Sequence, residues 1–237
     1  MRKFVGYAKN DNFSVGCTGQ TVYVYDVEGE EVGRFKDIKY GYKPLFCPHS
    51  NKVVVKSTAG MFAIYCLDTM KLIKKFRYSK VDAGQDQGFC FSPDGKYLYN
   101  IEKAIDENST RLSIYKTADF NCIKQLFEDN ELLELSAMEC DTSGIYLLGY
   151  FRDEEYHVKE TCFVAQLDND ILKNVTILDE NKFDFLRDYK SVQMMGFTSE
   201  AFETSFFKLN YFEESFTLEK LKSLNIKLSD YIKTDVE

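Results

Sequence analysis

The sequence has 237 residues, of which 44% are hydrophobic, with 20 Phe and 16 Tyr but no Trp. This composition excludes a disordered chain, and the length is sufficient for a buried core. The 30 basic and 38 acidic residues give a formal net charge of −8. A chain this acidic has no general attraction for phosphate backbones or anionic lipid, so we expect no nucleic-acid partner and no membrane partner.

The seven cysteines are odd in number, none forms a CxxC pair, and most lie in apolar runs typical of strands. A buried free cysteine behaves as a small hydrophobe, so we predict reduced thiols and a cytoplasmic location. The first residues have no apolar segment behind their basic side chains, and no run is long enough to cross a bilayer. The sequence therefore predicts neither a signal peptide nor a membrane span.

The first predicted unit covers residues 4–36. It contains four short extended runs, at 4–9, 13–17, 21–27 and 31–35, joined by turns of hairpin length. Four such strands in succession predict one antiparallel meander.

The second unit, residues 43–77, repeats this order of strands and turns. Its last run carries basic side chains at Lys71, Lys74, Lys75 and Arg77, interleaved with apolar ones. We interpret this alternation as the solvated side of a strand rather than as a nucleic-acid site.

The third unit, residues 87–127, opens with Phe89-Cys90-Phe91 and the turn sequence Ser92-Pro93-Asp94-Gly95. Phe89 and Phe91 share one face, because side chains alternate along a strand. Proline presets φ for the turn, while Asp94 and Gly95 supply a side-chain hydrogen bond and tolerance of positive φ.

The fourth unit covers residues 133–178, with turns at 141–144 and 168–170. Beyond it the pattern weakens. Residues 179–190 are predicted to be a polar and aromatic connection, and residues 191–237 a degenerate fifth unit. Leucines at 218, 221, 224 and 228 have helical spacing, so a helical end of the chain stays open as an alternative.

Four-stranded units that recur every 40–50 residues or so are typical of β-propeller blades. The third-strand positions Tyr25, Tyr65, Tyr115 and Gln166 mark this repeat. We therefore predict an all-β protein, a single propeller domain over residues 1–237 with about five blades. The predicted blades are 4–36, 43–77, 87–127, 133–178 and, less regular, 191–237.

Two segments resemble a known superfamily. Residues 24–32, with Tyr25-Asp26, are similar to the end of a WD repeat, and residues 91–98 are similar to the second-strand start of WD-repeat and YVTN-type propellers. The resemblance covers residues 4 to about 178 and implies a divergent member. The Trp is missing and neither His49 nor His157 follows a glycine, so the hydrogen-bonded tetrad of regular WD repeats is absent.

The sequence carries no hydrolase, zinc-protease or nucleotide-binding motif. His49 and His157 are predicted to be surface residues. The carboxylates of Asp82 and Asp86, and of Asp168 and Asp170, lack the spacing of a calcium loop, so we interpret them as turn residues. We assign no catalytic, metal-binding or cofactor-binding residue and expect no cofactor.

The sequence nevertheless suggests an interaction surface on the loops between successive blades. Exposed tyrosine near arginine is typical of binding hot spots, although the packing of blade seams is the simpler and preferred interpretation of the same tyrosines. The candidate rim residues are Tyr40, Tyr42, Tyr78, Asp82, Asp86, Arg187 and Tyr189. The function predicted first is a non-catalytic module that binds a protein or peptide. The alternatives are a lactonase-like propeller enzyme with carboxylates at a central channel, and an assembly part of a larger propeller.

Overall fold

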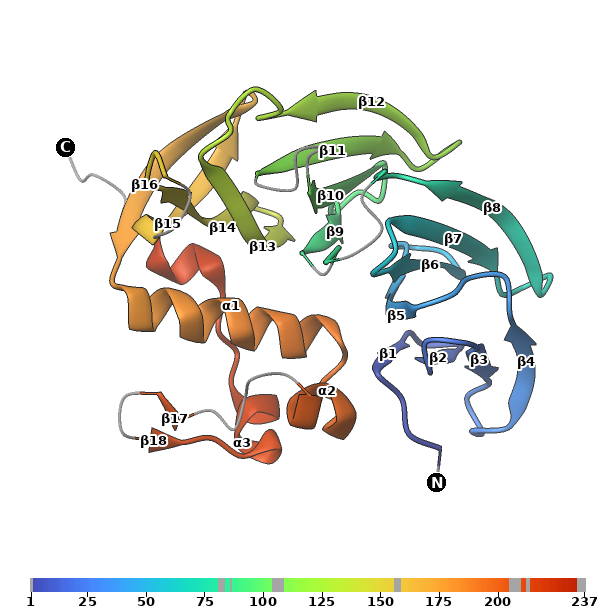
Figure 1. The fold of residues 1–237 in the computed structure, drawn as a ribbon. Coiled ribbons are helices and arrows are strands. Elements are labelled where there is room, and N and C mark those ends of the chain that lie inside the picture. Colours follow the sequence, from blue (N-terminus) through green and yellow to red (C-terminus); the bar gives the residue numbers. More distant parts are fainter. Residues whose placement is uncertain are drawn as a thin grey trace. The chain divides into compact units, whose positions relative to one another are not determined.

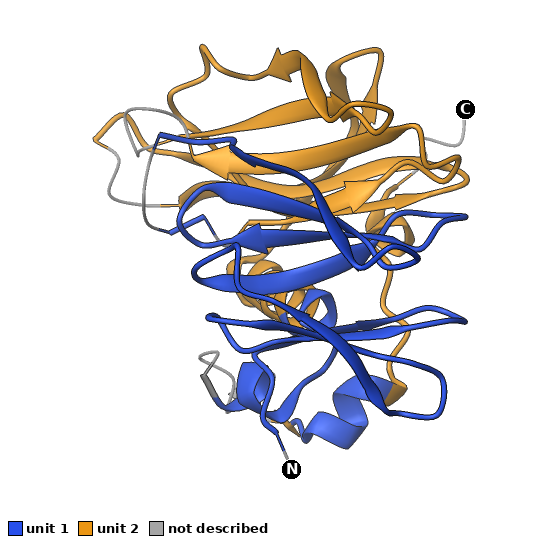
Figure 2. Ribbon diagram, turned by 90° about the vertical axis from the view of Figure 1, so that its right-hand side faces the viewer, with its two compact units in different colours: residues 1–86, 192–208, 216–222 blue, residues 87–191, 209–215, 223–237 orange. Residues whose placement is uncertain are grey.

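The computed structural model describes residues 2–80, 84–85, 87–103, 109–155, 159–204, 210–211 and 214–233. Strands β1–β16 form four antiparallel sheets of four strands, each in chain order (Figure 1). This confirms the predicted all-β, propeller-like fold; the sheets correspond to about four blades, where about five were predicted. The chain divides into two compact units (Figure 2). The first comprises 1–86, 192–208 and 216–222, and the second comprises 87–191, 209–215 and 223–237.

The first unit contains two of the sheets. Their strands are β1 (Gly6–Lys9), β2 (Ser14–Cys17), β3 (Val22–Tyr25) and β4 (Glu31–Phe35), then β5 (Gly41–Phe46), β6 (Lys52–Ser57), β7 (Met61–Cys66) and β8 (Lys71–Arg77). The two sheets approach closely where Gly6 faces Tyr42. A Cβ at Gly6 would lie 1.8 Å from the Tyr42 carbonyl oxygen, so only glycine fits there.

The second unit contains the other two sheets. Their strands are β9 (Phe89–Phe91), β10 (Tyr97–Lys103), β11 (Thr110–Lys116) and β12 (Asn121–Leu126), then β13 (Leu133–Asp141), β14 (Gly144–Arg152), β15 (Lys159–Asp168) and β16 (Ile171–Leu178). β9 and β13, the first strands of the two sheets, lie beside each other, and Gly88 N donates to Ser136 O at 3.4 Å.

The turn between β9 and β10 has the predicted chemistry. Ser92 Oγ donates to Asp94 Oδ1 at 2.7 Å, and Lys96 N donates to the same oxygen at 3.1 Å. Gly95 adopts φ +69° and its N–H donates to Ser92 O at 2.8 Å. The serine and aspartate therefore replace the hydrogen bonds that a sheet would otherwise give this backbone.

A β-bulge recurs at the same place in all four sheets. The pairing of the third strand with the fourth shifts register at Val24/Tyr25, Ile64/Tyr65, Ile114/Tyr115 and Val164/Gln166. These are the positions that mark the repeat in the sequence. The repeat is thus a repeat of backbone irregularity as well as of side chains.

Each unit has its own apolar core. In the first unit, Val15, Val24 and Val53 are fully buried, and the ring of Phe35 stacks on that of Tyr65 with centroids 4.1 Å apart. In the second, Leu135 and Leu147 lie in one cluster with residues of the neighbouring sheet, such as Ile101 on β10 and Leu112 on β11. Alternating strand side chains supply both cores.

The segment beyond Leu178 differs from the prediction. Residues 180–194 form helix α1 (Glu180–Met194) rather than a connection. The fully buried Phe183, Leu186 and Tyr189 recur every three residues along it, which is a helical spacing that the sequence analysis did not use.

The predicted degenerate fifth blade over 191–237 is wrong for the described residues. They form α2 (Ser199–Thr204), α3 (Leu218–Ser223), a 3-10 helix (Leu228–Tyr231) and one hairpin of β17 (Asn210–Tyr211) and β18 (Glu214–Ser215). The leucines at helical spacing had indicated this alternative. No helix of the described residues has the length and apolar character needed to cross a membrane.

Candidate interaction surfaces

In the first unit, Tyr40 is the exposed member of the predicted rim. It precedes β5 in the connection from β4, with φ +54° and 59% of its surface exposed. Its carbonyl oxygen accepts from Thr58 N at 3.2 Å, and the neighbouring Lys39 carbonyl accepts from Ser57 Oγ at 2.7 Å. The β6–β7 turn therefore holds the backbone that presents this ring.

Tyr42 and Tyr78 lie inside this region, at 8% and 7% exposure. The Tyr42 hydroxyl donates to Gln85 O at 2.6 Å, and the Tyr78 hydroxyl donates to Ser57 O at 3.0 Å. Both tyrosines thus stabilise the connection after β8 from inside the unit. Their rings are buried and are not available to a partner. Asp82 and Asp86 lie outside the described residues.

Two lysines that the sequence analysis did not select lie beneath these tyrosines. Lys43 and Lys56 are paired across β5 and β6, and both are almost completely buried. The Lys43 Nζ lies 5.0 Å from the Tyr42 ring centroid, and the Lys56 Nζ lies 5.3 Å from that of Tyr78. Cation–π contacts of this kind stabilise buried ammonium groups and further fix the tyrosines.

Arg187 and Tyr189 belong to α1, within the second unit. Tyr189 is fully buried, and its hydroxyl donates to Leu224 O at 2.7 Å. Arg187 is partly exposed and donates from Nε to Asp188 and from Nη1 to Asp184, both at 2.8 Å. Burial raises the pKa of Asp188, although Arg187 and the Tyr211 hydroxyl at 2.5 Å act against it. Tyr189 and Asp188 therefore hold α1 to the later segments that contain Leu224 and Tyr211.

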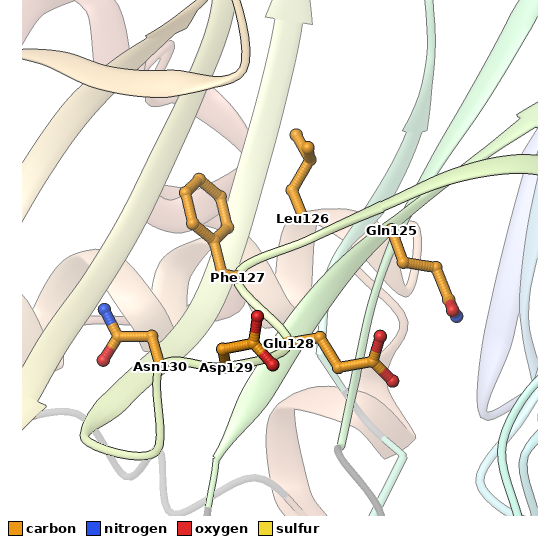
Figure 3. A pocket seen from close by; sticks show the side chains of 6 residues that line it. All are labelled: Gln125, Leu126, Phe127, Glu128, Asp129 and Asn130. Atoms are coloured by element: carbon orange, nitrogen blue, oxygen red, sulfur yellow. The ribbon is translucent and has the colours of Figure 1, made fainter.

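The second unit has an open cavity of about 500 Å³ where β12 passes into β13. We call it the acidic pocket; its lining residues are Gln125, Leu126, Phe127, Glu128, Asp129 and Asn130 (Figure 3). Figure 3 shows the Glu128 and Asp129 side chains extending to the same side of the picture, while Phe127 and Leu126 point away together. Both carboxylates are exposed.

Local backbone conformation shapes the acidic pocket. Phe127 adopts φ +66°, and Asn130 N donates to Phe127 O at 3.2 Å. The next turn follows at once, with Leu133 N donating to Asn130 O at 3.2 Å. Phe127 packs against the core of this unit. The connection is therefore anchored at its aromatic residue and displays the acidic residues that follow.

A buried ion pair supports the acidic pocket from the sheet. Arg111 Nη1 donates to Glu128 at 2.6 Å, and its Nε donates to the fully buried Glu102 at 2.7 Å. Burial acts to lower the pKa of Arg111, but the two carboxylates prevail and raise it. Arg111 stays charged and partly neutralises Glu128, so Asp129 carries the pocket's more accessible negative charge.

Several other residues considered in the sequence have ordinary surroundings. His49 is exposed in its turn with φ +58°, whereas His157 lies outside the described residues. Asp168 forms an ion pair with Lys173, with 2.5 Å between Oδ2 and Nζ, and Asp170 forms an ion pair with Lys124. Within the described part of the chain, no group of three or more His, Cys, Asp or Glu side chains is placed to hold a metal ion.

The acidic pocket was missed because its signal in the sequence is small. Glu128-Asp129-Asn130 reads as an ordinary polar turn, and only the positive φ of Phe127 gives it shape.

Comparison with known proteins adds information on the fold. The sequence matches no family profile, and no curated protein matches it.

Among solved structures, 1060 chains match, so the fold is widely shared and does not by itself select a function. One of them is the Kuenenia stuttgartiensis hydrazine synthase, a protein that contains a β-propeller. The TM-score is 0.55 at 15% sequence identity, over 71% of this chain and 51% of that chain. The chain thus spans about half of that protein's length, and the likeness supports the fold alone.

Proposed function

We propose that this chain is a non-catalytic binding module, built on a WD-like or YVTN-like propeller scaffold, that takes a basic segment of a protein or peptide into the acidic pocket. The observation that carries the proposal is the exposed carboxylate of Asp129, next to the Arg111-paired Glu128, in the lining of a cavity of about 500 Å³. Carboxylates in such a cavity complement a lysine or arginine side chain.

The surroundings of the acidic pocket favour an extended ligand. Phe127, which is half-buried and also lines the acidic pocket, offers an apolar contact to the methylene stem of a long cationic side chain. The Asn130 amide, which also lines the acidic pocket, offers hydrogen-bonding groups to a peptide backbone. The net charge of −8 increases the rate at which a cationic partner arrives.

The test is binding of short fluorescent peptides to the full chain, measured by anisotropy. We expect a lysine- or arginine-containing peptide to bind, and its glutamine-substituted version to bind more weakly. Asp129→Asn should weaken binding about fivefold, the value of one exposed charge pair of about 1 kcal/mol. Glu28→Gln, which removes an equally exposed charge outside the acidic pocket, is the matched control and should change nothing.

Salt provides a second measurement. Raising the salt concentration from about 0.05 M to about 0.5 M should weaken the same complex, because exposed charges are screened. Binding that is indifferent to salt and to Asp129→Asn would contradict the assignment of the acidic pocket. Turnover of a lactone by the unmodified chain, together with no peptide binding, would instead support the enzymatic alternative.

A further inference from the structure

Two of the seven cysteines are in side-chain contact within the second unit. Cys90 on β9 and Cys140 on β13 lie where these two strands meet, and their thiols interact. The backbone explains the contact. A Cβ at Gly88 would lie 2.9 Å from Met138 N, so the two strands touch at this pair of residues. Cys90 lies two residues after Gly88, and Cys140 lies two residues after Met138. Two residues is the period at which strand side chains return to the same face, so the two cysteines continue this contact.

The two thiols are unequal. The neighbouring Cys90 thiol lowers the pKa of Cys140, although burial and nearby carboxylates oppose this. The interaction with Cys140, followed by burial, raises the pKa of Cys90. Cys140 is therefore the first of the two to become a thiolate, while Cys90 keeps its proton. Cys140 is partly exposed, so a small reagent has access to its thiolate.

We propose that Cys90 and Cys140 form a reversible dithiol site that a hydroperoxide oxidises to a disulfide. The Cys140 thiolate attacks one oxygen of the hydroperoxide; an S–O bond forms, the O–O bond breaks, and the leaving alkoxide takes up a proton to become an alcohol. Cys90, once deprotonated, attacks Sγ of the resulting sulfenic acid. The S–S bond forms, the S–O bond breaks, and hydroxide leaves as water. Two thiols lose two electrons in all, and the hydroperoxide gains them.

The site lies between the first strands of two neighbouring sheets, where Met138 and Tyr99 pack nearby in the same apolar cluster. A disulfide there would covalently join two sheets that otherwise meet through side-chain packing and hydrogen bonds such as that from Gly88 N to Ser136 O. Since the strands already touch at Gly88, little backbone movement is needed to bring the sulfur atoms to bonding distance. Cys122, on β12, is more exposed and provides a comparison within the same unit.

The experiment treats the fully reduced chain with a stoichiometric amount of hydrogen peroxide, alkylates the remaining thiols and maps the peptides by mass spectrometry. We expect the number of free thiols to fall from seven to five, with a linked peptide pair containing Cys90 and Cys140 that dithiothreitol separates. Cys122→Ser should give the same linkage. Alkylation of Cys90 and Cys140 as complete as that of Cys122 after peroxide treatment would overturn the proposal.

Single variants test the order of the two steps. Cys90→Ser should stop at the Cys140 sulfenic acid, which dimedone traps, whereas Cys140→Ser should give no adduct at Cys90. The reverse pattern would overturn the assigned order. The peptide map of the unsubstituted chain decides the existence of the disulfide even where a variant fails to fold.

Discussion

The Nζ of Lys190 lies 2.8 Å from Oε2 of Glu139, and the same oxygen accepts the backbone N–H of Leu228 at 2.8 Å. Lys190 is on α1, Glu139 is on β13, and Leu228 begins the 3-10 helix. Burial lowers the pKa of Lys190, against the influence of Glu139. One carboxylate therefore holds two C-terminal elements of the second unit to its sheet.

Replacing that carboxylate should be costly. Glu139→Gln leaves the Lys190 ammonium, 4% exposed, without its negative partner. We expect a loss of about 3 kcal/mol in the free energy of unfolding, measured in urea, because a buried charge then loses its ion-pair partner. Asp170→Asn, which breaks the surface pair with Lys124, should cost less than about 1 kcal/mol. Equal effects of the two substitutions would contradict this account.

The hydroxyl of Tyr65 gives the opposite expectation. It is buried and finds no hydrogen-bond partner among the described residues. Tyr65→Phe keeps the ring stacked on Phe35 and removes the unsatisfied hydroxyl, so it should raise stability by about 1 kcal/mol. Tyr115 holds the equivalent position in the third sheet, but its hydroxyl is hydrogen-bonded to Ser113. Tyr115→Phe should therefore lower stability by about as much, and thermal unfolding of both variants measures the difference.

Gly196 is predicted to tolerate no side chain. Its φ is +74°, and a Cβ would lie 2.0 Å from Tyr7 O, in a segment where Tyr7 N donates to Met195 O at 3.1 Å. Gly196→Ala combines backbone strain with a clash against β1 and should cost more than about 2 kcal/mol. Gly29 has a similar φ of +85° with open space around it. Gly29→Ala should cost about 1 kcal/mol, and urea unfolding separates clash from strain.

The turn after β9 predicts an acid dependence. The Ser92 hydroxyl, together with Lys96, lowers the pKa of Asp94 from 3.8 to about 2. Because the folded state favours the ionised form, its stabilising effect is present above a pH of about 4 and is lost as the pH falls toward 2. Ser92→Ala should raise the pKa of Asp94, as measured by carboxyl NMR. Asp141, whose pKa Ser143 lowers in another turn, should titrate unchanged in that variant.

The sheets were predictable because their signals are local. Strand alternation and turn residues such as Asp94 and Gly95 lie within a few positions of one another, so the sequence alone places the first four units. The helical end was harder. Phe183, Leu186 and Tyr189 carry a helical period, but polar residues surround them, and nothing in the sequence indicates which sheet covers their apolar side.

The candidate surfaces depended on distant contacts and were less predictable. Tyr40, Tyr42 and Tyr78 look alike in the sequence, since all three lie in or next to predicted connections between blades. Only Tyr40 is exposed, because the hydroxyls of the other two donate to carbonyl groups that the fold brings near. The acidic pocket depends on a positive φ at Phe127, and the presence of a phenylalanine does not predict a positive φ. The contact of Cys90 with Cys140 joins residues 50 positions apart, beyond the reach of any local pattern.

The four repeated bulges bear on how copies of this chain meet in concentrated solution. Each bulge lies where a sheet's third strand pairs with its fourth, and the fourth strand is a free edge. These edges carry exposed apolar side chains such as Ile73, Ile123 and Ile177, which favour stacking of sheets into fibrils. A bulge bends and twists the strand, so its free backbone groups do not form a straight row for a second molecule. We expect resistance to fibril formation to be a property of the repeat itself.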